Sequence, residues 1–503
     1  MPKRSKFVAG TVVAVLLTIP LAGCSAGSSS DGAGGDADSL VVAFAVEPAN
    51  LDFTKTAGAA IPQVLLDNVY EGLVTQDESG EIVPLLAEDW TVSEDRTTYT
   101  FDLRTGVTFS NGDEFDADSA KFSIERVLSD EWTVPLASGM DVVDKVNVIS
   151  PDRVEVVLSE PSNGWLFRMT TRIGAMFAPN GVDDLANKPI GTGPYEVAQF
   201  TRGDSLLLEA RGDYWGEAPE MKSVTFRYFK DSTAMSNAKL TGDVDIIGTV
   251  LAPESISQFE GDDRFQVIEG PSNAEVVLSF NNAAGPLTDI RVRQAIKYAL
   301  DRQAIVDTVV DGYGTQIGSM VPPADPWYED LTGLYPYDPE KAKSLLREAG
   351  QENLSLRLRL PSQTYAVSAG QVVKSQLAQV GITAEIDVLE FPARWLEVVL
   401  TNHDYDMSII QHVEPRDISH FANPDYYFGY DSEKVRSLMA SAGADAPSEQ
   451  VPAMKAAARQ IAEDAAADWL FLFPFLAVAD ADLSGVPQDA VTESFDVTGI
   501  SRS

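Results

Sequence analysis

The sequence predicts an α/β protein with more than one domain, and three observations indicate this. The chain has 503 residues, well beyond the ~250–300 residues at which a single hydrophobic core stops growing. Apolar residues make up 44% of the chain and aromatic residues 9%, which is enough to fill several cores. Strand-like and helix-like patterns alternate along the C-terminal half, as in a sheet covered by helices.

The first 24 residues have the features of a lipoprotein export signal. Three basic residues among the first six precede a mostly apolar run over residues 7–20, which is too short to cross about 30 Å of hydrocarbon as a helix. The sequence Leu-Ala-Gly-Cys follows and ends in the only cysteine, Cys24. It resembles a lipobox, whose cysteine is lipidated, so we expect residues 1–23 to be a cleaved signal peptide. An ordinary secretory signal with an incidental cysteine is the alternative.

Residues 24–39 predict a flexible tether between the lipid and the folded body. From Ser25 to Ser39 only Ser, Gly, Ala and Asp occur, and such a segment buries no apolar surface. We expect structure from Leu40, where an apolar stretch begins. The sequence has no second apolar run long enough to cross a membrane. We therefore expect a protein held by its lipid on the outer face of the bacterial cytoplasmic membrane.

The charge and the residue counts argue against several functions. The chain has 37 Lys and Arg against 76 Asp and Glu, a net charge of −39, which repels phosphate and makes nucleic acid an improbable partner. Without residues 1–23, which hold three basic residues, the charge is 34 − 76 = −42. One cysteine forms no internal disulfide, and three histidines leave little room for a metal site. Motifs of serine hydrolases, zinc proteases and nucleotide-binding enzymes are missing, so we expect neither an enzyme nor a cofactor.

The first half of the folded body is rich in strands and turns, around residues 77–187. Apolar residues occupy every second position in residues 99–103 and 154–158, as in half-buried strands. Four acidic residues between Asp113 and Asp118 suggest calcium, but they lack the glycine and the final glutamate of a calcium-binding loop. We interpret them as a solvated turn with a helix start.

The C-terminal half predicts a βαβ arrangement. Asp338 and Pro339 suit the N-cap and the first position of a helix that Gly350 ends. The elements that follow are a strand over 354–360, a helix around 372–377 and a strand over 382–388. This order is typical of helices packed on a sheet.

A series of short segments along residues 40–480 carries a family resemblance. Examples are Gly-Thr-Gly-Pro-Tyr at 191–195 and Asp-Tyr-Trp-Gly at 213–216. The other segments are residues 67–73, 84–90, 93–95, 99–104, 106–107, 109–112, 242–246, 291–296 and 337–342. Taken in their order along the chain, these segments resemble those of the extracytoplasmic solute-binding proteins of ATP-binding-cassette (ABC) importers, in the peptide/nickel-binding group called family 5.

The resemblance implies a two-lobed periplasmic-binding-protein-like fold (type II, cluster C). Two α/β lobes are joined by hinge strands, an extra domain is inserted in the first lobe, and the ligand cleft lies between the lobes. The implied division is residues 40–76, 188–283 and 478–503 as lobe I, residues 77–187 as inserted domain II, and residues 284–477 as lobe II, or domain III.

The function that the resemblance implies is capture of di- or oligopeptides for import. The expected partners are a peptide ligand, an ABC permease with its ATPase, and the membrane through Cys24; the protein is expected to be a monomer. A binder of many peptides reads their shared parts, by pairing with the backbone and by placing a carboxylate against the terminal ammonium. The alternative is another solute on the same fold, such as a nickel complex or other metal chelate, an oligosaccharide or a cationic small molecule.

The loop after residue 410 is the expected ligand site. In the family's peptide binders the corresponding strand end pairs with the peptide, and an Asp beyond it pairs with the ammonium. The equivalent residues here are Gln411, His412 and Val413 for the strand and Glu414 for the carboxylate. An ion pair between Glu414 and Arg416 is the alternative. Further expected ligand-binding residues are Arg416, Asp417, Trp327, Tyr328, Gly58 and Ala59, and the aromatic residues at 327–328 and 426–428 either line the cleft or pack in the core.

The three histidines lie close together in the sequence, which raises the question of a metal. His403 precedes the predicted strand and His412 ends it, so about nine residues at ~3.3 Å each separate them by roughly 30 Å. These two cannot share an ion. His412 with His420 stays open as an alternative, and no metal ligand is predicted.

The lipid anchor gives the first testable prediction. Replacing Cys24→Ala should release the protein from the membrane fraction and leave its melting temperature unchanged, because the tether makes no core contacts. Fractionation of cells with an antibody to the protein measures this. Retention of the variant in the membrane fraction would contradict a lipid anchor at Cys24.

Overall fold

A computed structural model describes residues 37–503 apart from residues 78–79 and 251. The predicted signal peptide, Cys24 and the predicted tether up to residue 36 lie outside the described residues. The first strand, β1, begins at Ser39, one residue before the predicted start of structure.

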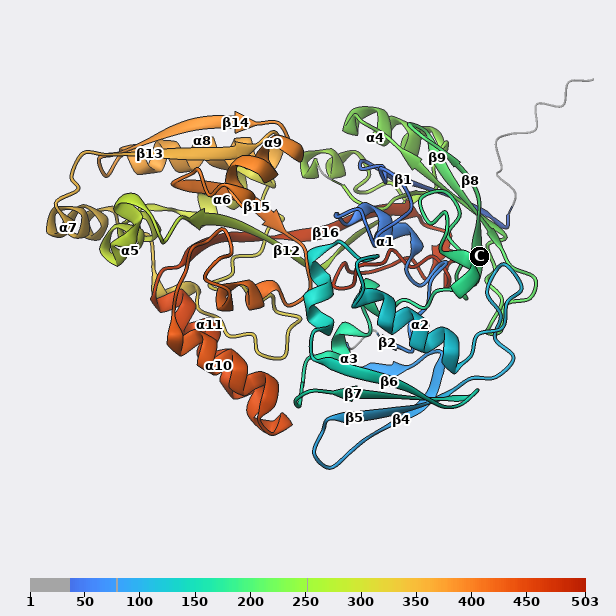
Figure 1. The fold of residues 1–503 in the computed structure, drawn as a ribbon. Helices are drawn as coiled ribbons and strands as arrows, with labels where there is room; N and C mark the ends of the chain where they lie inside the picture. Colours follow the sequence, from blue (N-terminus) through green and yellow to red (C-terminus); the bar gives the residue numbers. More distant parts are fainter. Residues whose placement is uncertain (1–36, 78–79, 251) are drawn as a thin grey trace, which may run out of the picture. The chain divides into compact units, whose positions relative to one another are not determined.

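A ten-stranded mixed sheet organises the described residues (Figure 1). Its strand order is β14-β13-β15-β12-β16-β11-β1-β10-β9-β8. The bounds are β1 (Ser39–Phe44), β8 (Tyr195–Thr201), β9 (Ser205–Ala210), β10 (Ser223–Tyr228), β11 (Ile246–Ile247), β12 (Phe265–Phe280), β13 (Leu354–Pro361), β14 (Ile382–Leu389), β15 (Met407–His412) and β16 (Ala467–Asp480).

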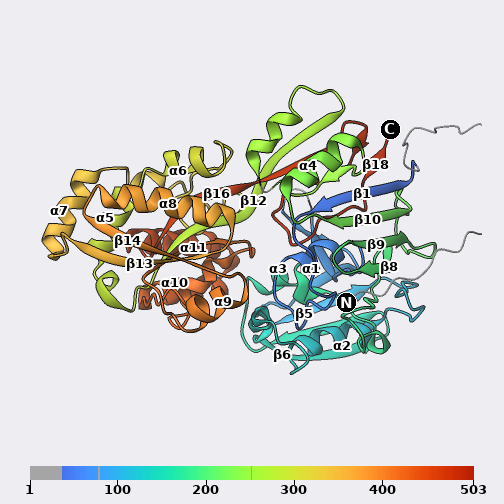
Figure 2. The ribbon, with the colours of Figure 1, turned by 90° about the horizontal axis from the view of Figure 1, so that it is seen from above.

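Strands β12 and β16 run between two groups of helices and strands, as Figure 2 shows from above, and each group has its own hydrophobic core. They pair antiparallel along both ends, and their register shifts between Gly270 and Ala274. Before the shift, Ile268 and Phe475 belong to the core around β1. After it, β12 and β16 contribute to the core around β13 and α8. At the shift, a β-carbon on Gly270 would collide with the Gln488 carbonyl, so only glycine fits there.

The second core contains the predicted βαβ unit. Helix α7 (Pro339–Ala349) starts at Asp338, whose carboxylate accepts a hydrogen bond from the Lys341 N–H, and ends at Gly350 in a left-handed conformation with φ 69°. Strands β13 and β14 are parallel, and α8 (Thr364–Ala378) connects them. The structure confirms the predicted helix and the predicted βαβ unit. Both could be predicted because helix caps and apolar periodicity depend only on neighbouring residues.

A four-stranded antiparallel sheet occupies part of the predicted insertion. Its strands, in spatial order, are β4 (Ala87–Val92), β5 (Thr98–Leu103), β7 (Arg153–Leu158) and β6 (Val143–Ser150). The alternate apolar residues of β5 and β7 are buried against α2 (Ala117–Val127) and its neighbours. Asp116 caps α2 through the Ser119 N–H, so the acidic cluster is a helix start, as predicted.

The remaining elements cover the sheets or connect them. They are α1 (Ala60–Leu65), β2 (Val74–Gln76), β3 (Ile82–Pro84), α3 (Trp165–Arg168), α4 (Ser232–Thr241), α5 (Ile290–Ala299), α6 (Arg302–Val309), α9 (Ala393–Trp395), α10 (Glu433–Ala444), α11 (Pro447–Glu463), β17 (Leu483–Ser484) and β18 (Ser501–Arg502). Short helical turns are η1 (Pro135–Met140), η2 (Arg172–Gly174), η3 (Pro179–Gly181), η4 (Pro253–Gln258), η5 (Gly285–Thr288), η6 (Thr332–Leu334), η7 (Leu396–Thr401) and η8 (Asp417–Ala422). Within the described ranges, no helix is both long and apolar enough to cross a membrane.

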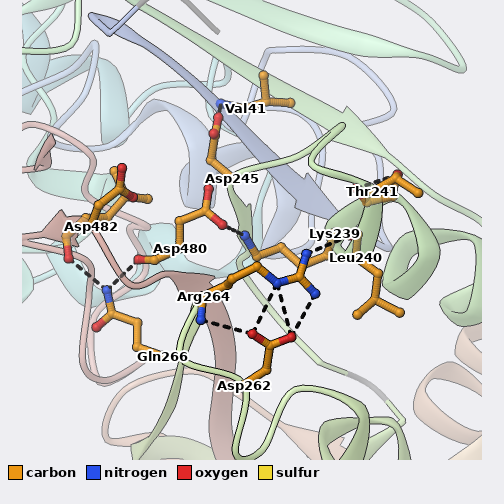
Figure 3. Close-up of polar contacts among 12 residues, drawn as sticks. Val41, Lys239, Leu240, Thr241, Asp245, Asp262, Arg264, Gln266, Asp480 and Asp482 are labelled. Atoms are coloured by element: carbon orange, nitrogen blue, oxygen red, sulfur yellow. Dashed lines mark hydrogen bonds and ion pairs between the residues drawn. The ribbon is translucent and has the colours of Figure 1, made fainter. Parts of the chain in front are cut away.

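A polar network fastens the end of β16 to α4, β11 and β1 (Figure 3). The Lys239 ammonium, fully buried, pairs with the Asp480 carboxylate, whose side chain is 25% exposed. Asp245 accepts a hydrogen bond from the Val41 N–H at 2.6 Å and one from Arg502 at 2.7 Å. Burial lowers the pKa of Lys239, while Asp480 favours its charged form. The network therefore joins Val41, residues 239–245, Asp480 and Arg502, which are distant from one another in the sequence.

Replacing Lys239→Met is expected to destabilise the protein. The change leaves Asp480 without its buried partner, and breaking a buried ion pair costs about 3 kcal/mol at the low end of its range. Thermal denaturation followed by circular dichroism measures the effect. The control is Lys55→Met, because Lys55 pairs with Glu131 where both side chains are about half exposed, and such a pair contributes at most about 1 kcal/mol. Equal melting temperatures of the two variants would contradict a stabilising role for the network.

Candidate ligand-binding site

The end of β15 has one edge that is not paired by a neighbouring strand. On one side β15 pairs with β12 over residues 407–412. On the other side it pairs with β13 only at Met407 and Ser408. Beyond them, the Gln411 N–H donates to the Tyr365 hydroxyl at 2.9 Å, and Val413 is 43% exposed. Beyond Ser408, this edge of β15 therefore has no strand pairing within the described residues.

His412 and Asp417 hold the loop that follows β15. His412 Nδ1 lies 3.3 Å from an Asp417 carboxylate oxygen, and its Nε2 lies 2.9 Å from the Tyr427 hydroxyl. The Tyr427 hydroxyl also contacts the Ser279 hydroxyl at 2.7 Å. Asp417 and Tyr427 are buried. His412 and Asp417, two of the predicted site residues, thus anchor the loop to the core.

Glu414 projects from this loop and pairs with His420. The Glu414 carboxylate lies 3.2 Å from His420 Nε2, and the His420 ring stacks on Tyr426 with centroids 4.2 Å apart. Burial by itself raises the pKa of Glu414, but the His420 hydrogen bond and nearby positive charges hold it below its usual range. The Glu414 side chain is 42% exposed. It is therefore a charged carboxylate with an accessible face.

Arg416 does not pair with Glu414, so the alternative ion pair considered from the sequence is wrong. Its backbone is left-handed, with φ 60°, which turns the side chain elsewhere. The guanidinium carbon lies 3.3 Å from the centroid of the Phe167 ring and 4.7 Å from that of Trp327. The nearest carboxylate is that of Asp325, 3.7 Å from Arg416 Nε. Burial lowers the pKa of Arg416 to about 10.

The aromatic residues named from the sequence pack in the core or against it, which is one of the two expected roles. Trp327 is buried in the core but presents its ring to Arg416. Tyr328 is half-buried beside the same core. Tyr426 stacks on His420, and Phe428 packs on Phe421 with centroids 4.4 Å apart.

The predicted insertion supplies the facing side of the site. Phe167 and Arg168 end α3, and Arg172 follows in η2. Arg172 pairs with Glu493 through its Nε at 2.6 Å and donates to the Gly58 carbonyl at 2.9 Å. The positive charge of Arg172 also acts on Glu414. Gly58 and Ala59, two of the predicted site residues, are exposed.

Glu275 and Asp325 are two further acidic residues near Asp417. Glu275 stands opposite His412 in the β12–β15 register. Burial and the charge of Asp417 raise the pKa of Glu275 well above its usual value. Burial also raises the pKa of Asp325 to about 6. In the described part of the chain no three His, Cys, Asp or Glu side chains form a group able to hold a metal ion.

Sequence reasoning missed Phe167, Arg168, Arg172 and Asp325. Each lies more than 80 residues before the loop in the sequence, and no local motif marks any of them. A hollow of about 420 Å³ lies apart from this site, lined by residues that include Pro194, Tyr214, Glu217 and Thr498.

The sequence of this chain is similar to those of known bacterial binding proteins. The sequence profile of bacterial extracellular solute-binding proteins, family 5 Middle, matches residues 81–417. The glutathione-binding protein GsiB of Salmonella paratyphi A is 28% identical over 349 residues, which is 68% of this chain and 68% of that protein.

Solved structures confirm the predicted two-lobed fold. DppA from Helicobacter pylori, in complex with the peptide STSA, has a TM-score of 0.82 at 22% identity, over 92% of this chain and 98% of its own. NikZ from Campylobacter jejuni, in complex with Ni(L-His), has a TM-score of 0.78 at 22% identity, over 93% of this chain and 100% of its own.

The Glu414–His420 pair gives a pH-dependent prediction. Burial opposes the charged imidazolium, but Glu414 and Asp417 raise the His420 pKa above 6.5. A raised folded-state pKa stabilises the protein below 6.5, and this contribution is lost as pH rises through the raised value. The melting temperature should fall between pH 6 and pH 8 by about 1–2 °C more in the unmodified protein than in His420→Gln.

The control for this prediction is His403→Gln, which removes a histidine that does not belong to the Glu414–His420 pair. His403 lies before β15, and its carbonyl accepts a hydrogen bond from Asn281. The control should keep the full pH dependence of the melting temperature. If His420→Gln keeps it as well, the pair does not contribute as argued.

Proposed function

The chain belongs to family 5 of the bacterial extracellular solute-binding proteins, and from this premise we propose that it captures di- or oligopeptides and delivers them to an ABC permease. Members of this family are substrate-binding transport proteins. We further propose that a lipid on Cys24 holds a monomer at the outer face of the cytoplasmic membrane.

The observation that carries the peptide proposal is the placement of Glu414 at the open end of β15. A peptide lying along this edge extends the sheet, and its main chain takes the hydrogen bonds that a neighbouring strand would take. The terminal ammonium then reaches the accessible face of a carboxylate whose pKa is held low. Both contacts use atoms that every peptide has, so they do not depend on its side chains.

Relatives support a ligand built from amino acids. Of the similar proteins named above, GsiB is a glutathione-binding protein, DppA was solved with a peptide, and NikZ was solved with a nickel–histidine complex. A metal chelate is the second candidate, because His412, at the end of β15, and His420 lie on either side of Glu414 in the sequence. Native mass spectrometry of the purified protein distinguishes the two by the mass of the captured ligand.

Closure on the ligand follows from the connection between the two cores. We propose the lobe boundaries given by the sequence, with β12 and β16 as hinge strands. The described structure already has contacts between the predicted insertion and the end of α10. Arg96 donates to the Asp445 carbonyl at 2.6 Å, and the Asn163 N–H donates to the Gly443 carbonyl at 2.8 Å. These groups bind the C-terminal end of α10, where carbonyls lack helical partners.

Glu414→Gln tests the ammonium contact. The variant keeps the shape of the side chain and removes its charge, and losing one partner of a desolvated charge pair costs about 2–5 kcal/mol. Because 1.4 kcal/mol is tenfold in affinity, peptides with a free ammonium should bind about 30-fold or more weakly. N-acetylated peptides should bind the unmodified protein poorly and should lose little more in the variant. Isothermal titration calorimetry measures both.

The matched control is Glu352→Gln, an exposed glutamate on the turn between α7 and β13, which should bind peptides like the unmodified protein. Equal binding of free and acetylated peptides to the unmodified protein would remove both the assignment of Glu414 and most support for peptides.

A further inference from the structure

Two residues of the predicted insertion, Arg96 and Asn163, bind the C-terminal end of α10. The Arg96 guanidinium donates to the carbonyls of residues 444 and 445, at 2.5 and 2.6 Å. The Asn163 side-chain amide donates to the carbonyls of residues 442 and 445, at 2.9 and 3.0 Å. The Asn163 N–H donates to the carbonyl between them, that of Gly443, at 2.8 Å. Four consecutive carbonyls of α10 and its end thus accept hydrogen bonds from the insertion.

The two sides of this contact belong to different hydrophobic cores. Phe101 and Trp165 of the insertion pack in the core around β1. Val435 of α10 packs in a core with Trp469 of β16. The chain passes between the two halves of the structure in β12 and β16, which pair with each other. The contact of the insertion with α10 therefore links the halves at a second place, apart from these strands.

The end of α10 needs donors from outside the helix. The last four carbonyls of any α-helix have no intrahelical partner. In α10, the Asp445 N–H donates back to the Ser441 carbonyl, and the last turn contains no basic residue. The next helix begins at Pro447, which has no N–H to donate. Because a cation is stabilising at a helix C-terminus, Arg96 supplies from the insertion what α10 itself lacks.

The backbone of Arg96 is strained, which also points to a role for its side chain. Arg96 has φ 59°, in the left-handed region that is uncommon for residues with a long side chain. It lies in the turn between β4 and β5, where its N–H donates to the Ser93 carbonyl at 2.9 Å. Its guanidinium also donates to Asn163 Oδ1 at 3.0 Å. Such strain persists where surrounding contacts offset it, and here those contacts are with Asn163 and α10.

We infer that Arg96 and Asn163 form a latch that holds the two halves of the protein closed, and that latching is a function of the predicted insertion. The inference rests on the closure included in the proposed function, and it adds that the protein's own contacts hold the closed form before a ligand arrives. None of the residues predicted for the ligand site takes part in these contacts. The latch therefore stabilises the closed form equally for every ligand, and the closed fraction sets the apparent affinity.

Small-angle X-ray scattering of the purified protein, freed of ligand by unfolding and refolding, tests the latch. The double variant Arg96→Ala/Asn163→Asp loses all side-chain hydrogen bonds to α10. Its new carboxylate also lies beside carbonyls that carry partial negative charge. The variant should have a larger radius of gyration than the unmodified protein. An unchanged radius of gyration overturns the latch.

Single variants at Arg96 separate the latch from the strain of the turn. Glycine adopts the left-handed backbone without strain, so Arg96→Gly keeps the turn and loses only the side chain. It should open the protein as Arg96→Ala does. Arg96→Lys keeps the charge but not the forked donors, and its radius of gyration should lie between. Opening by Arg96→Ala but not by Arg96→Gly would trace the effect to the backbone of the turn and overturn the latch.

The matched control is Arg153→Gln, an exposed arginine of the same sheet that pairs with Asp102. It should keep the radius of gyration of the unmodified protein, and a control that opens as well would contradict a specific role for Arg96 and Asn163. Melting temperatures establish that each variant folds, and Arg96→Gly takes the place of the double variant if that one does not.

Calorimetry with trialanine and trileucine separates the latch from the peptide proposal. Arg96→Gly should weaken the binding of both peptides by the same factor, about tenfold for the loss of two hydrogen bonds, because the closed fraction enters each affinity equally. Unequal factors, or unchanged affinities in a variant that scatters as open, would contradict a latch that sets affinity. If neither peptide binds the unmodified protein, the peptide proposal falls, and scattering of the ligand-free protein still decides the latch.

Discussion

The pairing of β12 with β16 is the constraint on which the rest of the structure depends. These strands of 16 and 14 residues run through both cores, and their register shifts where they pass from one to the other. β15 is aligned on β12, so the position of the loop with Glu414 is set by the same pair. Ser272, at the shift, bonds to the Phe473 carbonyl.

The electrostatics of the site differ from those of the protein as a whole. The chain carries a net charge of −39, which disfavours an anionic ligand at most of its surface. At the site, Arg168 and Arg172 of the predicted insertion interact electrostatically with Glu414. Because these groups are partly or fully buried, each charge acts strongly on its neighbours. Glu414 therefore has nearby positive charges although the chain as a whole is strongly negative.

Short-range sequence patterns predicted those helices and strands that depend only on neighbouring residues. The cap at Asp338, the stop at Gly350 and the strand periods of β5, β13 and β14 depend on neighbours within a few residues. The loop after β15 was also found, but the partners of its charges were not. Arg416 meets Phe167 and Trp327, about 250 and 90 residues away in the sequence. Such contacts follow from the order of strands in the sheet, which short motifs do not specify.

The most direct test of peptide capture between the two surfaces is a crystal structure of the protein with the ligand it retains on purification. The account predicts density for a peptide main chain beside Gln411–Val413, with its ammonium at Glu414. Ligand density confined to the hollow near Tyr214 and Glu217, or a bound molecule that leaves Glu414 on His420 alone, would contradict it.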